Sequence, residues 1–225
     1  TLGELAAGMA HELNQPLTAL LANTQAVSRL LRDEPPDLAL VQRAIDDAVQ
    51  QARRAADVVG RLRRAVERPD ARTIAQPMAL ELPLRSALHL LEPEFRRRQV
   101  LTQVESDGAP QVMADPVAVE QIVHNLLMNA LHVLEQVPVD ARRIRLWLGV
   151  EQGQGVLRVT DSGPGIAADV LPRLFQPFFS TRPGGMGLGL SLCETLATGM
   201  GGALTAANAE PRGAAFTLQL PLVMP

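Results

Sequence analysis

His11 is the first residue whose type and position could support chemistry. Apolar residues recur around it at Leu5, Met9, Leu13 and Leu17, which is a helical spacing. His11 lies two residues from Met9 and two from Leu13, so at about 100° per residue its side chain points away from the apolar stripe. A neutral imidazole is a competent nucleophile, and one ring nitrogen can attack a phosphorus atom while an acceptor holds the other. The alternative is an ordinary solvated histidine, because histidines are common on helix surfaces.

Two neighbours of His11 extend this candidate site. Glu12 could accept a hydrogen bond from the imidazole and act as a base, although adjacent helical residues diverge by about 100°, so the contact requires a favourable rotamer or a local distortion. Distortion is expected because the apolar stripe advances by fours here and Pro16 removes a backbone donor, so the helix should bend or overwind. Gln15 lies four residues after His11 and shares its face. Glu12 and Gln15 could equally be plain surface residues.

A second group of candidates is a line of amides on an apolar helical segment. Gln121, Asn125 and Asn129 follow Pro116 at intervals of four, so they share one face of a helix. Buried amides need hydrogen-bonding partners, which a bound ligand or other core groups can provide. His132 lies three residues further on, and a surface histidine is the alternative interpretation of it.

A third group consists of an aspartate and several glycines. Asp161 ends an apolar strand pattern and precedes Gly163 and Gly165. Its carboxylate can accept an amino proton, while the glycines let the backbone approach a flat ring. Residues 182–189 hold four glycines and end where a helix begins, so their amides can face phosphate groups at the positive end of a helix. For the Asp-Ser-Gly sequence, a bare turn is the alternative.

The elements that must position His11 are two long amphipathic helices. The first pattern runs from Leu2 to Leu31, where the sequence Asp-Glu-Pro-Pro-Asp interrupts it. Asp37 can cap a second helix, whose apolar residues between Leu38 and Val66 alternate spacings of three and four. Two such helices joined by a short turn leave an apolar seam open, which a second copy can cover by forming a dimeric four-helix bundle. The alternative is a hairpin that packs on the rest of its own chain.

The pattern divides the chain into a hairpin domain over residues 1–67, a connector over 68–77 and a second domain over 78–225. The second domain mixes helices with largely hairpin-connected strands, which predicts an α+β sandwich. We expect its helices over residues 83–98, 117–136 and 188–200, and its strands over residues 100–104, 144–151, 156–160, 203–207 and 215–220.

The composition excludes several classes of function. A net charge of -3 gives no electrostatic attraction to nucleic acid or to an anionic membrane surface. All 21 basic residues are arginine, which excludes the Walker A loop and the eukaryotic-type protein kinase, because both need a phosphate-binding lysine. The single cysteine, Cys193, lies in an apolar helical pattern and indicates a reduced, cytoplasmic protein. We expect no apolar stretch long enough to cross a bilayer, and we interpret the chain as a fragment whose sensor or membrane anchor precedes it.

Five motifs, in order along the chain, resemble those of sensor histidine kinases. The sequence Ala-His-Glu-Leu-Asn-Gln-Pro-Leu at 10–17 resembles the H-box, in the Asn-Gln-Pro variant of nitrogen-fixation and dicarboxylate sensors. Residues 125–130 resemble the N-box, 161–165 the G1 box, 175–181 the F-box and 185–190 the G2 box. The resemblance implies a dimerisation and histidine phosphotransfer hairpin followed by an ATP-binding domain of the Bergerat type. One glycine motif alone would be weak evidence for this resemblance, whereas the five motifs in order span nearly the whole chain.

The resemblance also implies roles for individual residues around the acceptor and the phosphates. His11 would accept the γ-phosphate of ATP with Glu12 as its base, and Gln15 would position a water for dephosphorylating the partner protein. Asn129 would bind Mg²⁺ through its carbonyl oxygen. Asn125 would line the phosphates.

The other residues that the resemblance assigns to the nucleotide lie on the second domain. Asp161 would accept the adenine amino proton, and residues 182–189 would form a short lid anchored by the phenylalanines of the F-box. Arg182 stands where many relatives have lysine. The remaining expected contacts are His132, Gly163, Gly165, Thr181, Arg182, Gly185, Gly187, Leu188, Gly189 and Thr217.

The expected activity is autophosphorylation of His11 and then transfer of the phosphoryl group to an aspartate of a response regulator, with no nucleic acid and no direct membrane contact. One alternative is an ATPase of the same nucleotide-binding fold, although such relatives activate water with a glutamate where this chain has Asn125. A second alternative is a non-enzymatic dimeric phosphotransfer or scaffolding module. Whether the histidine of the same or of the other subunit is phosphorylated depends on the turn at Pro35 and Pro36.

Overall fold

The computed structural model describes residues 2–32, 37–66, 75–182 and 187–223; in the first two helices it describes the side chains of residues 15–32, 37–52 and 55. The chain forms two compact units, Thr1–Arg68 and Pro69–Pro225. Most of the predicted connector lies outside the described residues. Its last two residues, Gln76 and Pro77, belong to strand β1 (Gln76–Ala79), so the regular structure of the second unit begins earlier than predicted.

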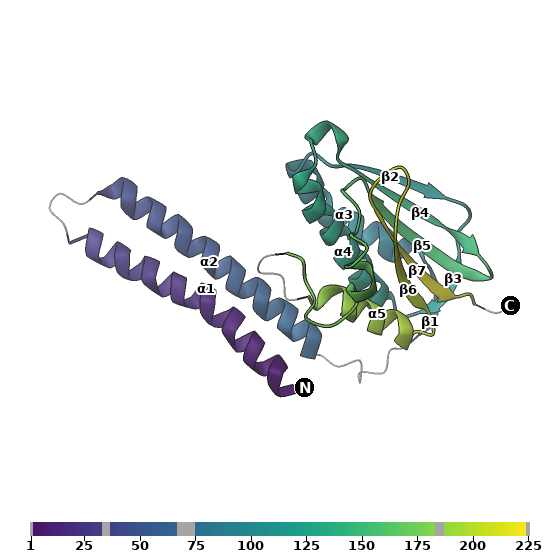
Figure 1. The fold of residues 1–225 in the computed structure, drawn as a ribbon, viewed down its shortest axis with the longest axis horizontal. Coiled ribbons are helices and arrows are strands. Elements are labelled where there is room, and N and C mark those ends of the chain that lie inside the picture. Colours follow the sequence, from purple (N-terminus) through teal and green to yellow (C-terminus); the bar gives the residue numbers. More distant parts are fainter. Residues whose placement is uncertain (1, 33–36, 67–74, 183–186, 224–225) are drawn as a thin grey trace. The chain divides into compact units, whose positions relative to one another are not determined.

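The first unit is an antiparallel pair of helices, α1 (Leu2–Leu30) and α2 (Leu38–Val66) (Figure 1). α1 continues through Pro16, which is buried, and the bend expected there stays a prediction. Asp37 caps α2 as predicted, because its Oδ1 atom accepts a hydrogen bond of 3.0 Å from the Leu40 backbone. Pro35 and Pro36, on which the handedness of the turn depends, lie outside the described residues.

The hairpin buries one apolar stripe and leaves another open. Val41, Ala48 and Ala55 are buried and follow one another at intervals of seven, as expected for helices packed along a heptad seam. Ile45 and Val49, on a neighbouring stripe of α2, are 41% and 46% exposed in the single chain. These two side chains and Leu20 and Val27 of α1 line an apolar groove of about 250 Å³. The hairpin therefore presents apolar surface that a single copy leaves uncovered.

The second unit is an α/β sandwich, as predicted, with helices covering one face of a sheet (Figure 1). The sheet has the strand order β2-β4-β5-β7-β6, with β2 and β4 parallel and the other neighbours antiparallel. Its strands are β2 (Leu101–Ser106), β4 (Arg143–Glu151), β5 (Gln154–Asp161), β6 (Ala203–Asn208) and β7 (Ala214–Pro221). The helices are α3 (Glu81–Arg97), α4 (Pro116–Val133) and α5 (Gly189–Gly199), with the 3-10 turns η1 (Leu134–Gln136), η2 (Val139–Ala141) and η3 (Leu171–Arg173).

A second, two-stranded sheet was not expected from the sequence. It pairs β1 with β3 (Gln111–Ala114) in antiparallel register. Both strands have four residues, too few for a period of two to stand out, and Pro77 argues against a strand unless the strand lies at an edge. In a ribbon of two strands every strand is an edge, so Pro77 is accommodated.

α4 is the central helix of the sandwich, and its local sequence explains where it begins. Asp115 caps it, because its Oδ1 atom accepts hydrogen bonds from the backbones of Val117 (2.8 Å) and Ala118 (3.4 Å), and Pro116 occupies the first turn. Leu126 and Leu127 on this helix are fully buried. The packing of α4 between α3 and α5 fixes one face of the helix and the polar line on it.

Against the expectation that no apolar stretch is long enough to cross a bilayer, one described helix passes that test by length and composition only. Pro116–Gln136 has a mean hydropathy of 1.2 and is long enough, but half of the tested stretch is buried inside the sandwich. The same segment carries Gln121, Asn125 and Asn129, so its apolar character belongs to a core helix.

Truncating the core of the sandwich should unfold the second unit selectively. Leu157 on β5 is fully buried, so Leu157→Ala should lower the free energy of unfolding by about 2 to 5 kcal/mol. Leu101→Ala is the matched control, because Leu101 on β2 is 63% exposed and its loss should change stability by less than about 0.5 kcal/mol. Urea unfolding followed by the fluorescence of Trp147, the single tryptophan, measures both. Equal losses in the two variants would contradict the described core.

Candidate functional site

Asp161 is a buried carboxylate at the end of β5, on the face of the sheet that the helices cover. It is 5% exposed, and its Oδ1 atom accepts hydrogen bonds from the backbone N–H groups of Gly163 (2.7 Å) and Ala214 (3.3 Å). Burial raises the pKa of Asp161 above its usual value, and the two backbone hydrogen bonds offset only part of that rise. No arginine among the described residues forms an ion pair with it. Asp161 is therefore a buried acceptor that no described arginine pairs with.

The loop after Asp161, residues 162–166, is fixed by hydrogen bonds at its start. Ser162 Oγ donates to the carbonyl of Ala141 (2.6 Å) and accepts from the backbone N–H of Arg143 (2.9 Å). This loop, called the β5 loop below, carries Gly163 and Gly165. Gly163 therefore contacts Asp161, whereas Gly165 lies against Asn208 and Gly213.

The turn that leads into β7 closes against Asp161 from the other side. Gly213 has a φ of +107°, and a Cβ atom there would lie 1.8 Å from the Asp161 carbonyl oxygen. Only glycine fits both the backbone conformation and this approach. The sequence analysis missed Gly213 and Ala214 as parts of the site, because the register between β5 and β7 that brings them to Asp161 leaves no local pattern.

The amide line on α4 faces the start of α5. Asn125 is half-buried, its side chain hydrogen-bonds with the Cys193 thiol, and a Cβ atom on Gly189 would lie 3.8 Å from Asn125 Oδ1. Burial raises the pKa of the Cys193 thiol to about 12, so this cysteine is a packing residue that holds Asn125. Asn129, one turn further on, is half-buried as well. The structure thus brings Asn125 together with Gly189, two residues that the sequence analysis assigned to one site.

Gln121 Nε2 on α4 is buried without a hydrogen-bonding partner among the described residues. Buried polar groups normally have partners, so this atom indicates a place where a ligand or water is needed. His132 Nδ1 is buried as well, and the imidazole interacts with the Met128 backbone one turn earlier. Burial lowers the pKa of His132, and the positive charges of Arg182 and Arg98 lower it further. His132 is therefore a neutral imidazole at neutral pH, and Arg182 lies close enough for its charge to act on it.

The segment on either side of residues 183–186 is anchored by backbone contacts. The Phe178 N–H donates to the carbonyl of Gly187 (3.0 Å), and Gly187 has a φ of +64° with no room for a Cβ atom, which would lie 2.4 Å from the Phe179 carbonyl oxygen. The Arg173 guanidinium covers the Phe179 ring at 4.2 Å from its centroid. Phe175 packs against the core, whereas Phe178 is 51% exposed, so not all three phenylalanines pack as expected.

The remaining predicted residues of this segment have different placements. Thr181 and Arg182 are exposed, Leu188 is half-buried, and Gly189 begins α5. Gly185 lies outside the described residues.

Thr217 is not brought to the same place as Asp161. It pairs with Arg158 across β5 and β7, and Arg158 Nε donates to Thr217 Oγ1 (3.3 Å) while its guanidinium covers Trp147. Side chains alternate along a strand, so Thr217 and Arg158 lie on the face of the sheet opposite the buried Phe216 and Leu218. We therefore leave Thr217 out of the proposed nucleotide site.

The three residues predicted on the first helix belong to the other unit. His11 and Glu12 lie within α1, but their side chains are outside the described part of the chain. Gln15 is exposed one turn further on.

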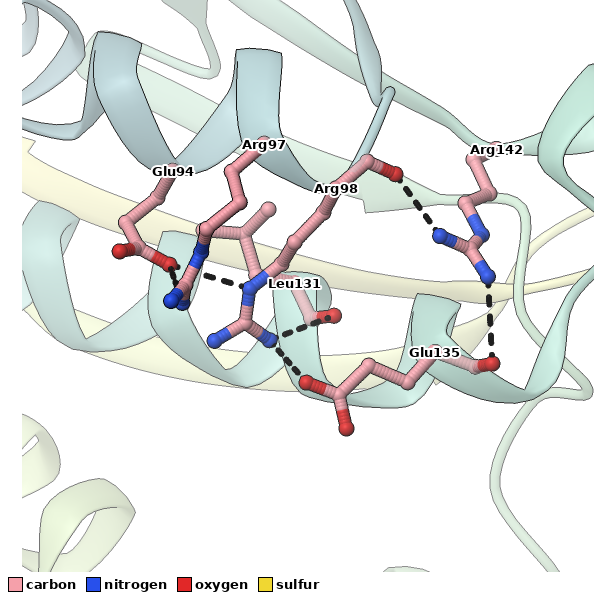
Figure 2. A network of polar contacts seen from close by, with 6 residues as sticks. All are labelled: Glu94, Arg97, Arg98, Leu131, Glu135 and Arg142. Carbon is pink, nitrogen blue, oxygen red and sulfur yellow. Dashed lines mark hydrogen bonds and ion pairs between the residues drawn. The ribbon is translucent and has the colours of Figure 1, made fainter. Parts of the chain in front are cut away.

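The end of α4 next to His132 is held by two arginines (Figure 2). Arg98 donates through Nε to Glu94 (3.1 Å), pairs with Glu135, and donates to the carbonyl of Leu131 (3.5 Å). Arg142 donates to the carbonyls of Arg98 (2.8 Å) and Glu135 (3.3 Å). Because Arg98 is only 15% exposed, its ion pairs are screened less than ordinary surface pairs. These contacts join the C-terminal ends of α3 and α4 and fix the helix end that carries His132.

Comparison with known protein families gives two matches. Residues 1–68 match the His Kinase A (phospho-acceptor) domain, and residues 114–224 match the histidine kinase-, DNA gyrase B-, and HSP90-like ATPase family. Together the two models cover most of the chain.

Individual proteins are similar over nearly the whole chain. The sensor histidine kinase TmoS of Ectopseudomonas mendocina is 32% identical over 99% of this chain and 23% of its own length, and the sensor protein FixL of Bradyrhizobium diazoefficiens is 34% identical over 98% of this chain and 43% of its own length. The chain thus spans less than half of these relatives. The crystal structure of the histidine kinase ThkA in complex with the response regulator protein TrrA has the same fold, with a TM-score of 0.73 and 24% identity over 99% of this chain and 62% of that one.

Replacing the buried carboxylate of Asp161 by an amide should stabilise the folded chain in a pH-dependent way. Because the pKa of Asp161 is raised, the folded state holds its proton to higher pH than the unfolded state, so wild-type stability falls as the pH rises through that window. Asp161→Asn keeps the oxygen that accepts from Gly163 and Ala214 but carries no charge. The gain of Asp161→Asn over wild type in the free energy of unfolding should be absent near pH 3, grow as the pH rises and then level off. Urea unfolding at a series of pH values measures this gain, and a stability difference that is independent of pH would contradict it.

Proposed function

We propose that this chain, which belongs to the sensor histidine kinases of two-component systems, binds ATP in its second unit and transfers the γ-phosphoryl group to His11. The observation that carries this proposal is Asp161, a buried acceptor with a raised pKa and no ion pair within the part of the chain that the structure describes. A carboxylate in such a position lowers stability unless a donor binds it. The exocyclic amino group of adenine is a donor of the right kind.

The residues around Asp161 and along α4 fit the rest of an ATP molecule. The β5 loop would form a wall beside the base, and Asn125 and Asn129, whose amides are half-buried, would face the phosphates. The neutral, half-buried imidazole of His132 and the exposed guanidinium of Arg182 would add a polar contact and a charge beside that line. The start of α5 at Gly189 adds backbone N–H groups at the positive end of a helix.

Magnesium is part of this proposal through Asn129. Among the described residues, no group of three or more His, Cys, Asp or Glu side chains is placed to hold a metal ion. Mg²⁺ commonly takes one or two protein oxygens together with substrate phosphates, and the carbonyl oxygen of Asn129 would be such a ligand. When bound, the ion would neutralise charge on the phosphates during transfer.

His11 would be the acceptor. One imidazole nitrogen attacks the γ-phosphorus while the bond from phosphorus to the bridging oxygen of ADP breaks, and Glu12 takes the proton from the other nitrogen. The phosphoryl group would then pass to an aspartate of a response regulator, as the partnership of ThkA with TrrA suggests. Gln15 is exposed one turn after His11, and it would position a water molecule that hydrolyses the phosphoryl group from that regulator.

The mechanism is tested by following labelled γ-phosphate. Wild-type protein with Mg-ATP should acquire label in an acid-labile, base-stable form, and His11→Gln should abolish it. His89→Gln is the matched control, since His89 is an exposed histidine on α3, and it should be labelled like wild type. Release of inorganic phosphate without labelled protein would instead support an ATPase, and no turnover of Mg-ATP would support a non-enzymatic module.

The homodimer is also part of the proposal, because the hairpin leaves an apolar groove open. A charge in this groove would be buried without a partner in a four-helix bundle, so Val49→Glu should shift the protein to monomer at micromolar concentration. Gln50→Glu introduces the same charge at the next, exposed position and should remain dimeric. Sedimentation equilibrium measures both, and a dimeric Val49→Glu would contradict the proposed interface.

A further inference from the structure

The turn between β6 and β7, residues 208–213, contacts the β5 loop along its length. These two segments lie far apart in sequence, and nothing in the five motifs includes the turn. Ala209 N–H donates to the carbonyl of Gly213 (2.9 Å), so the turn is closed by its own backbone. Its contacts with the β5 loop come from two side chains, Asn208 and Arg212.

Asn208 holds the far end of the β5 loop at two points. Its Oδ1 atom accepts from the Ile166 N–H (2.6 Å), and its Nδ2 atom donates to the Ile166 carbonyl (2.9 Å). The amide thus uses a donor and an acceptor on one residue, as a neighbouring β-strand would. Because both the N–H and the carbonyl of Ile166 are hydrogen-bonded to Asn208, the β5 loop cannot shift along the turn without losing both bonds.

Arg212 holds the near end of the same loop. Its Nε atom donates to the carbonyl of Gly163 (2.9 Å), while the Gly163 N–H donates to Asp161 Oδ1. Ala214, directly after the turn, donates its own N–H to the same Oδ1 atom. The turn therefore reaches the carboxylate both directly and through Gly163.

We propose that Asn208 and Arg212 are positioning residues that set the place of Asp161 and thereby the affinity and base selectivity of the nucleotide site. This inference rests on the proposed function. Both side chains are exposed, so they contribute little to the core, and removing either leaves no cavity in the sandwich. What their removal changes is the β5 loop and, through Gly163, one of the two N–H groups that orient the Asp161 carboxylate.

The selectivity follows from the chemistry of the base. In the proposed site the Asp161 carboxylate accepts a hydrogen bond from an amino group, which adenine has at the position where guanine has a carbonyl oxygen. A carboxylate held in one place favours ATP over GTP, whereas a carboxylate that shifts accepts either more equally. Loss of the turn contacts should therefore weaken ATP binding and reduce the difference in affinity between ATP and GTP.

The test is a calorimetric titration of the full chain with Mg-ATP and with Mg-GTP. Asn208→Ala and Arg212→Ala should each raise the dissociation constant for ATP roughly tenfold, the size that one or two lost net hydrogen bonds give. The constant for GTP should change much less. Arg212→Lys keeps a donor and should recover part of the ATP affinity. Thr205→Ala, an exposed position on β6, should bind like wild type.

Kinetics and stability separate this role from general damage. At saturating ATP, Asn208→Ala should autophosphorylate at a rate close to that of wild type, while its KM for ATP should rise. The thermal midpoint of this variant without nucleotide should stay near the wild-type value. Wild-type affinity for ATP in both alanine variants, or an equal loss for ATP and GTP, would overturn the inference. Failure of the wild-type chain itself to bind Mg-ATP would overturn the proposed function, so the two failures are distinguishable.

Discussion

The burial of the Asp161 carboxylate, which forms no ion pair with any residue that the structure describes, is the constraint on which the rest of the second unit depends. A buried charge needs hydrogen-bond donors, and here the backbone supplies two, from segments on opposite sides of the residue. Their approach requires a glycine at position 213, where a side chain would collide with the Asp161 backbone. Among the described residues, two main-chain N–H groups donate to this carboxylate, both to Oδ1.

A site built on one strand end needs rigid neighbours, because small displacements cost binding energy. α4 provides one neighbour: its apolar side chains are buried in the sandwich, while its amides line one exposed edge. Arg98 and Arg142 fix the C-terminal end of this helix by joining it to α3. Cys193 fixes Asn125 from the side of α5. Asn125 and the helix end that carries His132 are therefore supported by residues that are not themselves proposed ligand contacts.

The sequence predicted the long periodic elements and much of the site. α1, α2, α3 and α4 each have a clear helical period, and Asp37 was a correct cap. The motifs also grouped Asn125 with Gly189 and Gly163 with Asp161, and the structure brings both pairs together. Strands β1 and β3 were missed because four residues show no reliable alternation, and the prediction for Thr217 ignored that neighbouring strand residues face opposite sides. Asn208, Arg212 and Ala214 act through contacts between β5, β6 and β7, which no local pattern reveals.

The central claim is that Asp161 recognises a nucleotide through its carboxylate. The most direct measurement is the heat of titrating Mg-ATP into the wild-type chain and into Asp161→Asn, which retains the oxygen bonded to Gly163 and Ala214 but loses the charge and gains a donor. The account predicts saturable binding by wild type and none by the variant at the same concentrations, while both remain folded. Binding of equal strength by the two proteins would contradict it.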